Sequence, residues 1–455
     1  MKINPFFLTD SYKITHWLQY PPGTQVIRSY ASSRGGVFKD VVFCLLQYQL
    51  LEYLQGQFVT QHDLDEAAPI LHEHFGHDWL NREGWQHIIT DHQGKLPVSI
   101  RAVREGTVVP TKNVLLTIEN TCPRCSWVTN FLETLLVQCW YPWAVATTSR
   151  AVKQIILREL ELTGDPALIP FKLHDFGCRG VSSMESAMIG GAAHLTQFKG
   201  TDTLPAIWML NKYYAKSCAG HSIPASEHST ITAWGILNEV DAFRNMLDQY
   251  PNDLVACVSD SFDIFHACKA YWGQILRDRV LQRNGVLIVR PDSGNPEVTL
   301  LEVFRILGEA FGTQLNTKGY KLLDPHVRVI QGDGVNPDAI QSILYALRHA
   351  QWSADNLAFG MGGALLQQVN RDTQQVAMKC SQAVIHGVTK DIWKAPVGDP
   401  SKHSLRGRLS LVKTAEGFET LSNVNTPQDL LIEVFLNGEI RKRWTFDEVC
   451  EQAQL

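Results

Sequence analysis

The stretch Arg290-Pro291-Asp292-Ser293-Gly294-Asn295-Pro296 indicates how the middle of this 455-residue chain folds. It follows the apolar run Val286-Leu287-Ile288-Val289, which is short and β-branched enough for a buried parallel strand. It precedes apolar residues at helical spacing, namely Leu300, Phe304, Leu307 and Phe311. We therefore predict a strand, a tight turn and a helix, in that order.

The turn itself carries local signals and two charges. Gly294 permits a tight turn, Asn295 is a predicted helix N-cap, and Pro296 suits the first helical position. Arg290 and Asp292 stand at the carboxyl end of the predicted strand, which is where ligands of parallel sheets bind. Charges there are costly unless they bind something, so this strand end marks a site.

The same order of strand, polar loop and helix recurs along the chain. Three further apolar runs each precede a polar or glycine-rich loop: Leu254–Val258 before Ser259-Asp260-Ser261, Val327–Ile330 before Gln331-Gly332-Asp333-Gly334, and Leu357–Phe359 before Gly360-Met361-Gly362-Gly363. Such repeats build a parallel α/β barrel or an open doubly wound sheet. No GxGxxG fingerprint follows an early strand, which favours the barrel.

Both ends of the chain differ from this middle part. The first part mixes amphipathic helices with strands, and after Arg371 strands return, with Ile432–Leu436 leading into the hairpin signal Asn437-Gly438. We predict an α/β fold in two domains. Residues 1–145 with 385–455 form a mixed α/β domain, and residues 146–384 form the barrel.

The composition is that of an ordinary globular protein, with 45% hydrophobic and 19% charged residues. The net charge of −5 argues against a sequence-independent grip on nucleic acid, and we predict neither a membrane span nor a signal peptide. Ten scattered cysteines fit a reducing, cytoplasmic location. The close pair Cys122 and Cys125 lacks a second pair at zinc-ribbon spacing, so we interpret it as two incidental thiols in a loop.

Two of the predicted strand-end loops are built alike. The segment from Asp292 to Glu297 matches that from Asp333 to Asp338 in its aspartate, its Asn-Pro pair and its final acid. Carboxylates placed in this way could hold a ribose diol or, through water, a magnesium ion. A purely structural use in turns and helix caps is equally compatible with the pattern.

Positive charges and free backbone N–H groups are predicted near these loops. Arg179, Arg290 and Arg371 stand at loop positions, and the glycine-rich turn 360–363 precedes a helix, where a phosphate binds readily. Together with the paired carboxylates they indicate a phosphorylated sugar, whereas the P-loop GxxxxGK[ST] is absent from the sequence. His228 is either an ordinary hydrogen-bonded histidine or one that handles a proton, with Glu227 orienting its ring.

The order of these motifs resembles that of the nicotinamide phosphoribosyltransferase family. The matching segments run from Thr9-Asp10-Ser11-Tyr12-Lys13 through KLHDFGCRGVSS, FKGTDT, SEHSTITAWG, VSDSFDIF, RPDSGNP, VIQGDGVN and AFGMGG to GRLSL. The resemblance implies an irregular α/β barrel beside a mixed α/β domain, and a homodimer with its active site at the interface. It also implies phosphoribosyl transfer from phosphoribosyl pyrophosphate to nicotinamide in NAD biosynthesis, with Mg²⁺ and with ATP as co-substrate.

The resemblance further implies a role for each matching residue. Phe176 and Tyr12 of the partner subunit would sandwich the pyridine ring, and Asp202 would accept a hydrogen bond from the carboxamide. The remaining residues would hold the sugar and its phosphates: Arg290 at the carboxamide or the pyrophosphate, Asp292, Asp333 and Gly332 at the ribose, Gly362, Gly363 and Arg371 at the 5′-phosphate, Arg179 and His228 at the pyrophosphate, and Lys379, Lys394 and Lys402 along the phosphate channel. Asp260 is a candidate carboxylate on the magnesium side.

The implied chemistry needs no strong base, because the ring nitrogen of nicotinamide carries no proton. Catalysis is therefore expected from positioning and charge stabilisation, with Arg290, Asp292 and a His228 that ATP phosphorylates. The chain departs from the family pattern in having Met361 and Ala377 in place of serines, and Cys178 in place of an aromatic, which bears on the strength of ATP coupling. The alternatives are a nicotinate phosphoribosyltransferase, whose acidic substrate Asp202 would repel, and an extracellular signalling protein.

Overall fold

The computed structural model describes residues 3–398 and 403–454, and the chain divides into two compact units. The mixed unit comprises residues 1–147, 212–216 and 370–455, and the barrel unit comprises residues 148–211 and 217–369. The expected domain boundary at 384/385 differs from this division. The reason is that strand β14 (Val376–Ile385) pairs with β1 (Thr24–Ser33) in the sheet of the mixed unit.

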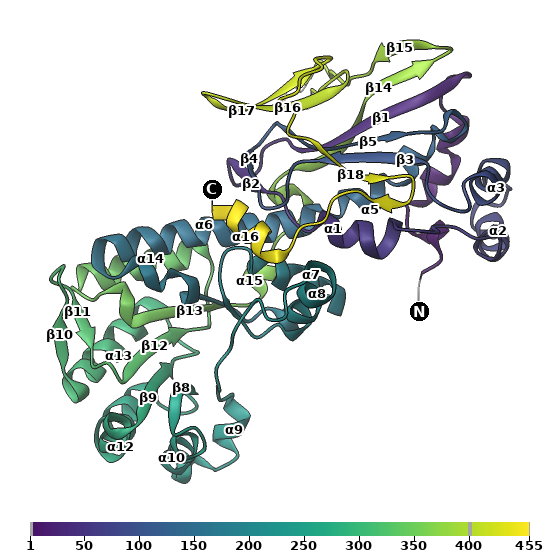
Figure 1. Ribbon diagram of the computed structural model, residues 1–455. Coiled ribbons are helices and arrows are strands. Elements are labelled where there is room, and N and C mark those ends of the chain that lie inside the picture. The colour runs from purple at the N-terminus through teal and green to yellow at the C-terminus, as the bar shows by residue number, and fades with distance from the viewer. Residues whose placement is uncertain (1–2, 399–402, 455) are drawn as a thin grey trace. The chain divides into compact units, whose positions relative to one another are not determined.

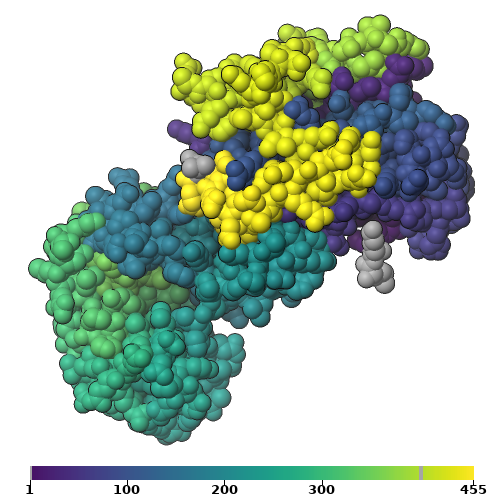
Figure 2. Space-filling model, in the orientation of Figure 1, coloured from purple at the N-terminus to yellow at the C-terminus, as the bar shows by residue number. Residues whose placement is uncertain are grey.

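Both ends of the chain build the sheet of the mixed unit, as the sequence predicted (Figure 1). Its seven strands lie in the order β15-β14-β1-β5-β3-β18-β19, and neighbouring strands pair antiparallel. The bounds not yet given are β3 Val98–Ala102, β5 Val114–Asn120, β15 Val388–Asp391, β18 Ile432–Leu436 and β19 Glu439–Ile440. Figure 2 shows the C-terminal part of the chain, in yellow, packed against its N-terminal part, in blue, on the surface of this unit.

Two short sheets and a set of helices complete the mixed unit. β2 (Asp40–Val42) pairs with β4 (Val108–Pro110), and β16 (Leu409–Thr414) pairs with β17 (Gly417–Ser422). The predicted hairpin at Asn437-Gly438 is confirmed, with both residues at positive φ. The helices are α1 Leu46–Gln49, α2 Gln61–Phe75, α3 Arg82–Asp91, α4 Val128–Phe131, α5 Glu133–Val137, α6 Trp140–Thr163, which runs past the unit boundary, and α16 Phe446–Gln454.

Parallel strands form the centre of the barrel unit. They lie in the order β7-β6-β13-β12-β9-β8, with bounds Gly200–Thr201, Leu173–Asp175, Leu357–Met361, Val327–Gln331, Asn284–Arg290 and Asn252–Val258. The segment 221–225 closes this sheet, because His221 bridges to Gly200 at one edge and Ala225 bridges to Ala256 at the other. Ile223, between these bridges, packs with the interior residues Ala256, Ile288 and Ile330. The predicted α/β barrel is therefore confirmed.

Helices follow the barrel strands, and two of them begin as the sequence predicts. Asn295 accepts from the N–H of Val298 and caps α13 (Pro296–Phe311), after a turn with Gly294 at φ 84°. Asn336 caps α14 (Pro337–His349) through the N–H of Ala339. The other helices are α7 Met184–His194, α8 Leu204–Tyr214, α9 His228–Thr232, α10 Glu239–Gln249, α11 Ile264–His266, α12 Arg277–Gln282 and α15 Gly363–Leu366. Among the described residues, no helix combines the length and apolar character that a membrane crossing requires.

One buried lysine links the start of β6, the first strand of the barrel unit in sequence, to the start of β13, its last strand. The Lys172 ammonium, directly before β6, donates to the carbonyl oxygens of Ala354 at 3.0 Å, Asp355 at 2.9 Å and Leu357 at 2.9 Å. An ammonium has three donors, so this group is fully satisfied although Lys172 is only 6% exposed. The lysine of the KLHDFG segment is therefore structural.

We expect Lys172→Met to lower the free energy of unfolding by about 3–5 kcal/mol, because three carbonyl groups lose their donor in a buried place. Urea unfolding followed by circular dichroism measures this loss. Lys199→Met, which changes an exposed lysine of the same unit, is the matched control and should change stability by less than about 0.5 kcal/mol. Equal stability of the two variants would contradict the structural role.

Candidate active site

The carboxyl ends of the barrel strands bring the predicted residues to one edge of the sheet. Phe176 follows β6, Asp202 follows β7, and Asp260 lies two residues beyond β8. Arg290 ends β9, and Gly332 and Gly362 follow β12 and β13. An open pocket at this edge is lined by Phe176, Cys178, Arg179, Met184, Asp202, Ala225, Ser226, Glu227 and Arg290.

The Phe176 ring lies against glycine backbone. A Cβ atom at Gly360 would lie 1.9 Å from the ring, and one at Gly332 would lie 3.4 Å from it. Gly360 is therefore required by the close approach of this ring, a constraint that the sequence analysis did not identify. The Arg290 guanidinium carbon lies 5.7 Å from the ring centroid, so a cation borders the aromatic platform.

Asp202 is held at the pocket by one of its two carboxylate oxygens. Oδ1 lies 2.8 Å from His174 Nε2 and also accepts from the Ser222 hydroxyl, and neither contact uses Oδ2. Although partial burial opposes ionisation, the bonds from His174 and Ser222 keep the pKa of Asp202 below its ordinary value. The pocket thus presents a charged oxygen to any ligand. His174 and Ser222 were missed by the sequence analysis, since only the fold brings them to Asp202.

Arg290 and Asp292, the two charges of the opening stretch, pair with each other. Arg290 Nη2 donates to Asp292 Oδ2 at 2.6 Å, and both side chains are less than one-fifth exposed. Asp292 Oδ1 also lies 3.2 Å from where a Cβ of Gly332 would stand, so the two matched loops approach each other. Asp333 is exposed on the second of these loops. A ligand would find a paired cation and anion here, with a further carboxylate on the neighbouring loop.

The Asp260 carboxylate connects two loops. Oδ1 lies 3.0 Å from His228 Nε2, and Oδ2 accepts from the Asp292 N–H at 2.9 Å and from the Ser293 hydroxyl at 2.6 Å. The Asp260 side chain is 3% exposed, whereas that of His228 is 46% exposed. Asp260 therefore orients the His228 ring. Glu227, expected to do so, instead accepts a hydrogen bond from Ser229.

The glycine-rich turn lies beside the loop that carries Arg179. A Cβ at Gly180 would stand 3.5 Å from Gly363 N, and one at Gly362 would stand 3.4 Å from the Phe176 carbonyl oxygen. Arg179 is exposed in this loop. Met361, where a serine was expected, is fully buried at the end of β13 and has no hydroxyl to offer.

The other predicted residues belong to the mixed unit and are described within it. Tyr12 is 57% exposed, and its ring meets His16 edge-on at 4.7 Å. Lys379 on β14 lies among cations: burial, and then repulsion from Arg34, Lys394 and Arg371, lower its pKa against the attraction of Glu133. Arg34 was missed by the sequence analysis, because its position beside Lys379 depends on strand pairing. Lys402 lies outside the described residues.

Comparisons with known proteins identify the family of the chain. A model of the nicotinate phosphoribosyltransferase (NAPRTase) family matches residues 171–439, and one of the nicotinamide phosphoribosyltransferase N-terminal domain matches residues 4–100. A nicotinamide phosphoribosyltransferase of Xanthomonas campestris pv. campestris is 48% identical, covering 98% of this chain and 97% of that protein. One of Acinetobacter baylyi is 30% identical, covering 99% and 97%.

Two solved structures share the fold at 15% sequence identity. Nicotinate-nucleotide pyrophosphorylase from Pyrococcus furiosus has a TM-score of 0.62, covering 99% of this chain and 95% of that one. Human nicotinic acid phosphoribosyltransferase has a TM-score of 0.58, covering 98% and 93%. The family models and the full-length relatives show that the chain is a pentosyltransferase and belongs to the nicotinamide phosphoribosyltransferases of the NAPRTase family.

Proposed function

We propose that the protein transfers the phosphoribosyl group of phosphoribosyl pyrophosphate to nicotinamide, giving nicotinamide mononucleotide and pyrophosphate. The observation that carries this choice of substrate is the Asp202 carboxylate, which is ionised at the pocket of Phe176 and uses Oδ1, not Oδ2, in its bonds to His174 and Ser222. A carboxylate attracts the carboxamide N–H₂ of nicotinamide and repels the carboxylate of nicotinate. The relatives named nicotinamide phosphoribosyltransferase support the same choice.

The remaining residues are assigned to the sugar and its phosphates. Asp292, Asp333 and Gly332 hold the ribose, and Arg290 binds either the carboxamide oxygen or the pyrophosphate. The phosphate contacts come from Gly362, Gly363 and Arg371 at the 5′-phosphate, Arg179 and His228 at the pyrophosphate, and Lys379, Lys394 and Lys402 along the path to them. The donors at the pyrophosphate stabilise this leaving group as negative charge develops on it.

The reaction breaks the bond between C1 of the ribose and the pyrophosphate oxygen, and forms a bond between C1 and the pyridine nitrogen. No proton moves at that nitrogen, so the residues contribute by positioning and by charge. Magnesium, when bound with the pyrophosphate, supplies neutralising charge there. Asp260 stays the candidate carboxylate on the magnesium side, and its bonds to His228, Asp292 and Ser293 make it a positioning residue as well.

ATP coupling through His228 is part of the proposal. Asp260 holds Nε2, so Nε2 carries the proton and Nδ1 keeps the lone pair that attacks the γ-phosphorus of ATP, with ADP leaving. The same Asp260 carboxylate binds the loop of Asp292, which gives a physical link between the phosphorylated residue and the ribose site. The homodimer and the cytoplasmic location stay predictions of the sequence analysis.

We expect Asp202→Asn to reduce kcat/KM for nicotinamide roughly 10- to 100-fold, since a charge-assisted hydrogen bond contributes about 1.5–3 kcal/mol. The ratio of nicotinate to nicotinamide use should rise, because the repelling charge is gone. Initial rates with each base measure both effects, and Asp278→Asn, which changes a carboxylate that is 83% exposed, is the control. A wild-type enzyme that used both bases equally well would instead favour a nicotinate phosphoribosyltransferase.

We expect His228→Ala to abolish both the stimulation by ATP and the incorporation of phosphate from γ-labelled ATP. Asp260→Asn should slow incorporation at least about 10-fold, because the ring loses the carboxylate that fixes its tautomer. The control is His326→Ala, which removes a histidine that also bonds an aspartate, Asp324, at 2.8 Å. Full ATP stimulation of His228→Ala would refute the phosphohistidine.

We expect a mixture of Tyr12→Ala and Asp292→Ala proteins, refolded or subunit-exchanged together, to recover about a quarter of wild-type activity. In a homodimer whose sites take Tyr12 of the partner subunit, half of the dimers are mixed and each has one intact site. Asp202→Ala mixed with Asp292→Ala is the control and should recover nothing, because both residues belong to the barrel unit. No recovery in the first mixture would place Tyr12 outside the partner's site.

A further inference from the structure

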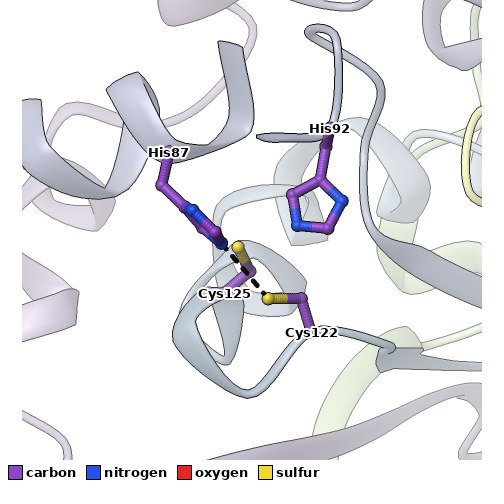
Figure 3. A group of neighbouring side chains, drawn as sticks. All are labelled: His87, His92, Cys122 and Cys125. Atoms are coloured by element: carbon purple, nitrogen blue, oxygen red, sulfur yellow. Dashed lines mark hydrogen bonds between the residues drawn. The ribbon is translucent and has the colours of Figure 1, made fainter. Parts of the chain in front are cut away.

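Four side chains of metal-binding types, none of them assigned a role above, converge in the mixed unit. His87 lies in α3, His92 follows that helix directly, and Cys122 and Cys125 stand around the turn after β5 (Figure 3). One ligand atom of each residue lies within 4.8 Å of those of the other three. The sequence analysis dismissed Cys122 and Cys125 because no second cysteine pair exists, but the fold supplies two histidines in its place.

The cluster is compact and partly closed to solvent, with His92 and Cys122 half-buried. His87 Nε2 lies 3.4 Å from Cys122 Sγ, and the His87 and His92 rings meet edge-on with centroids 5.1 Å apart. The Cys125 N–H donates to the Cys122 carbonyl oxygen at 2.9 Å, which turns both thiols to the same side. Cys125 is fully buried and His87 is 9% exposed.

His92 gives the sharpest indication that a partner is missing. Its Nε2 atom is buried and has no hydrogen-bond partner among the described residues. Hydrogen bonding within the cluster accounts for His87 and Cys122, but it leaves this nitrogen unsatisfied, which is costly for a buried polar atom. A metal ion between the four side chains would satisfy it.

The surroundings of His87 suit the binding of a metal. Nδ1 lies 2.6 Å from Asp91 Oδ2, and an Nδ1–H that donates to this carboxylate leaves the lone pair on Nε2, facing the cysteines. Arg124 Nη1 lies 3.1 Å from the same Nδ1 and would favour the opposite tautomer, with the proton on Nε2. Asp91 and Arg124 thus compete for one ring nitrogen, and only the bond to Asp91 is compatible with coordination.

Two thiolates and two imidazoles form a donor set that zinc favours, at bond lengths that give a tetrahedron with edges of about 3.3–3.8 Å. The separation of His87 Nε2 and Cys122 Sγ already fits such an edge, and the widest pair must close by roughly 1 Å. We propose that His87, His92, Cys122 and Cys125 bind one zinc ion that fastens the end of α3 to the turn after β5. Binding displaces the protons of the two thiols, which pass to solvent.

The proposed ion is structural, because protein atoms fill all four positions of the tetrahedron. It lies where two segments meet over an aromatic cluster. Trp85 of α3 contacts Trp127 at 4.8 Å and Phe131 at 4.9 Å, and both partners follow the cysteine turn in sequence. A zinc link between the same two segments would hold this packing in place.

Metal analysis of the full-length protein, purified under reducing conditions without chelator, tests the proposal. We expect one zinc ion per chain, and after exchange with cobalt the absorption of a tetrahedral, thiolate-bound Co²⁺. Cys125→Ser and His92→Ala should each lose the zinc and the cobalt spectrum. Cys218→Ser, which changes an exposed thiol in the barrel unit, is the control and should keep both.

Asp91→Asn separates a metal site from a hydrogen-bonded cluster. This variant should keep the zinc ligands but weaken zinc affinity roughly 10- to 100-fold in competition with a chelating dye, as expected for the loss of a carboxylate behind a ligating histidine. Arg124→Gln should not weaken it, since its competing donor is removed. Protein that contains no zinc and takes up none after reduction would overturn the proposal, and so would a Cys122–Cys125 disulfide that persists under reducing conditions.

Discussion

The site of the barrel unit depends on one buried carboxylate that serves two loops. Asp260 receives a backbone N–H and a hydroxyl from the loop after β9, and it faces the His228 ring with its other oxygen. A carboxylate that is 3% exposed is tolerable only when its oxygens are satisfied, so the burial of Asp260 requires both loops in their observed places. The geometry of the loop after β9 is thereby fixed before any substrate binds. Catalysis by positioning of the reactants requires such a fixed geometry.

Glycine supplies the second constraint, through the absence of a side chain. Phe176 lies so close to Gly360 that any Cβ there would overlap its ring, and Gly332 leaves just enough room for Asp292, Phe176 and Arg290. Gly360 and Gly332 thus lie directly beneath the Phe176 ring. Glycine backbone therefore packs against one side of the ring.

Local features of both units could be predicted from the sequence, whereas the closure of the barrel could not. The strand before Arg290, the Asn295 and Asn336 caps and the Asn437-Gly438 hairpin follow from rules that act over a few residues. The segment 221–225 that closes the barrel has no comparable signal, since it makes single bridges to two strands far apart in sequence. For the same reason His174, Ser222 and Arg34 were missed, and Cys122 with Cys125 was judged without its histidines.

The cationic residues around Lys379 bear on the proposed binding of phosphate. Burial lowers the pKa of Lys379, and repulsion from Arg34, Lys394 and Arg371 lowers it further. A bound phosphate would relieve both costs by offering negative charge and hydrogen-bond acceptors, and would raise the pKa of Lys379 toward its ordinary value. Because linkage is reciprocal, phosphate should bind more weakly as the pH rises and Lys379 loses its proton. Under the proposed function, the repulsion present in the free protein would thus add to the affinity for phosphate.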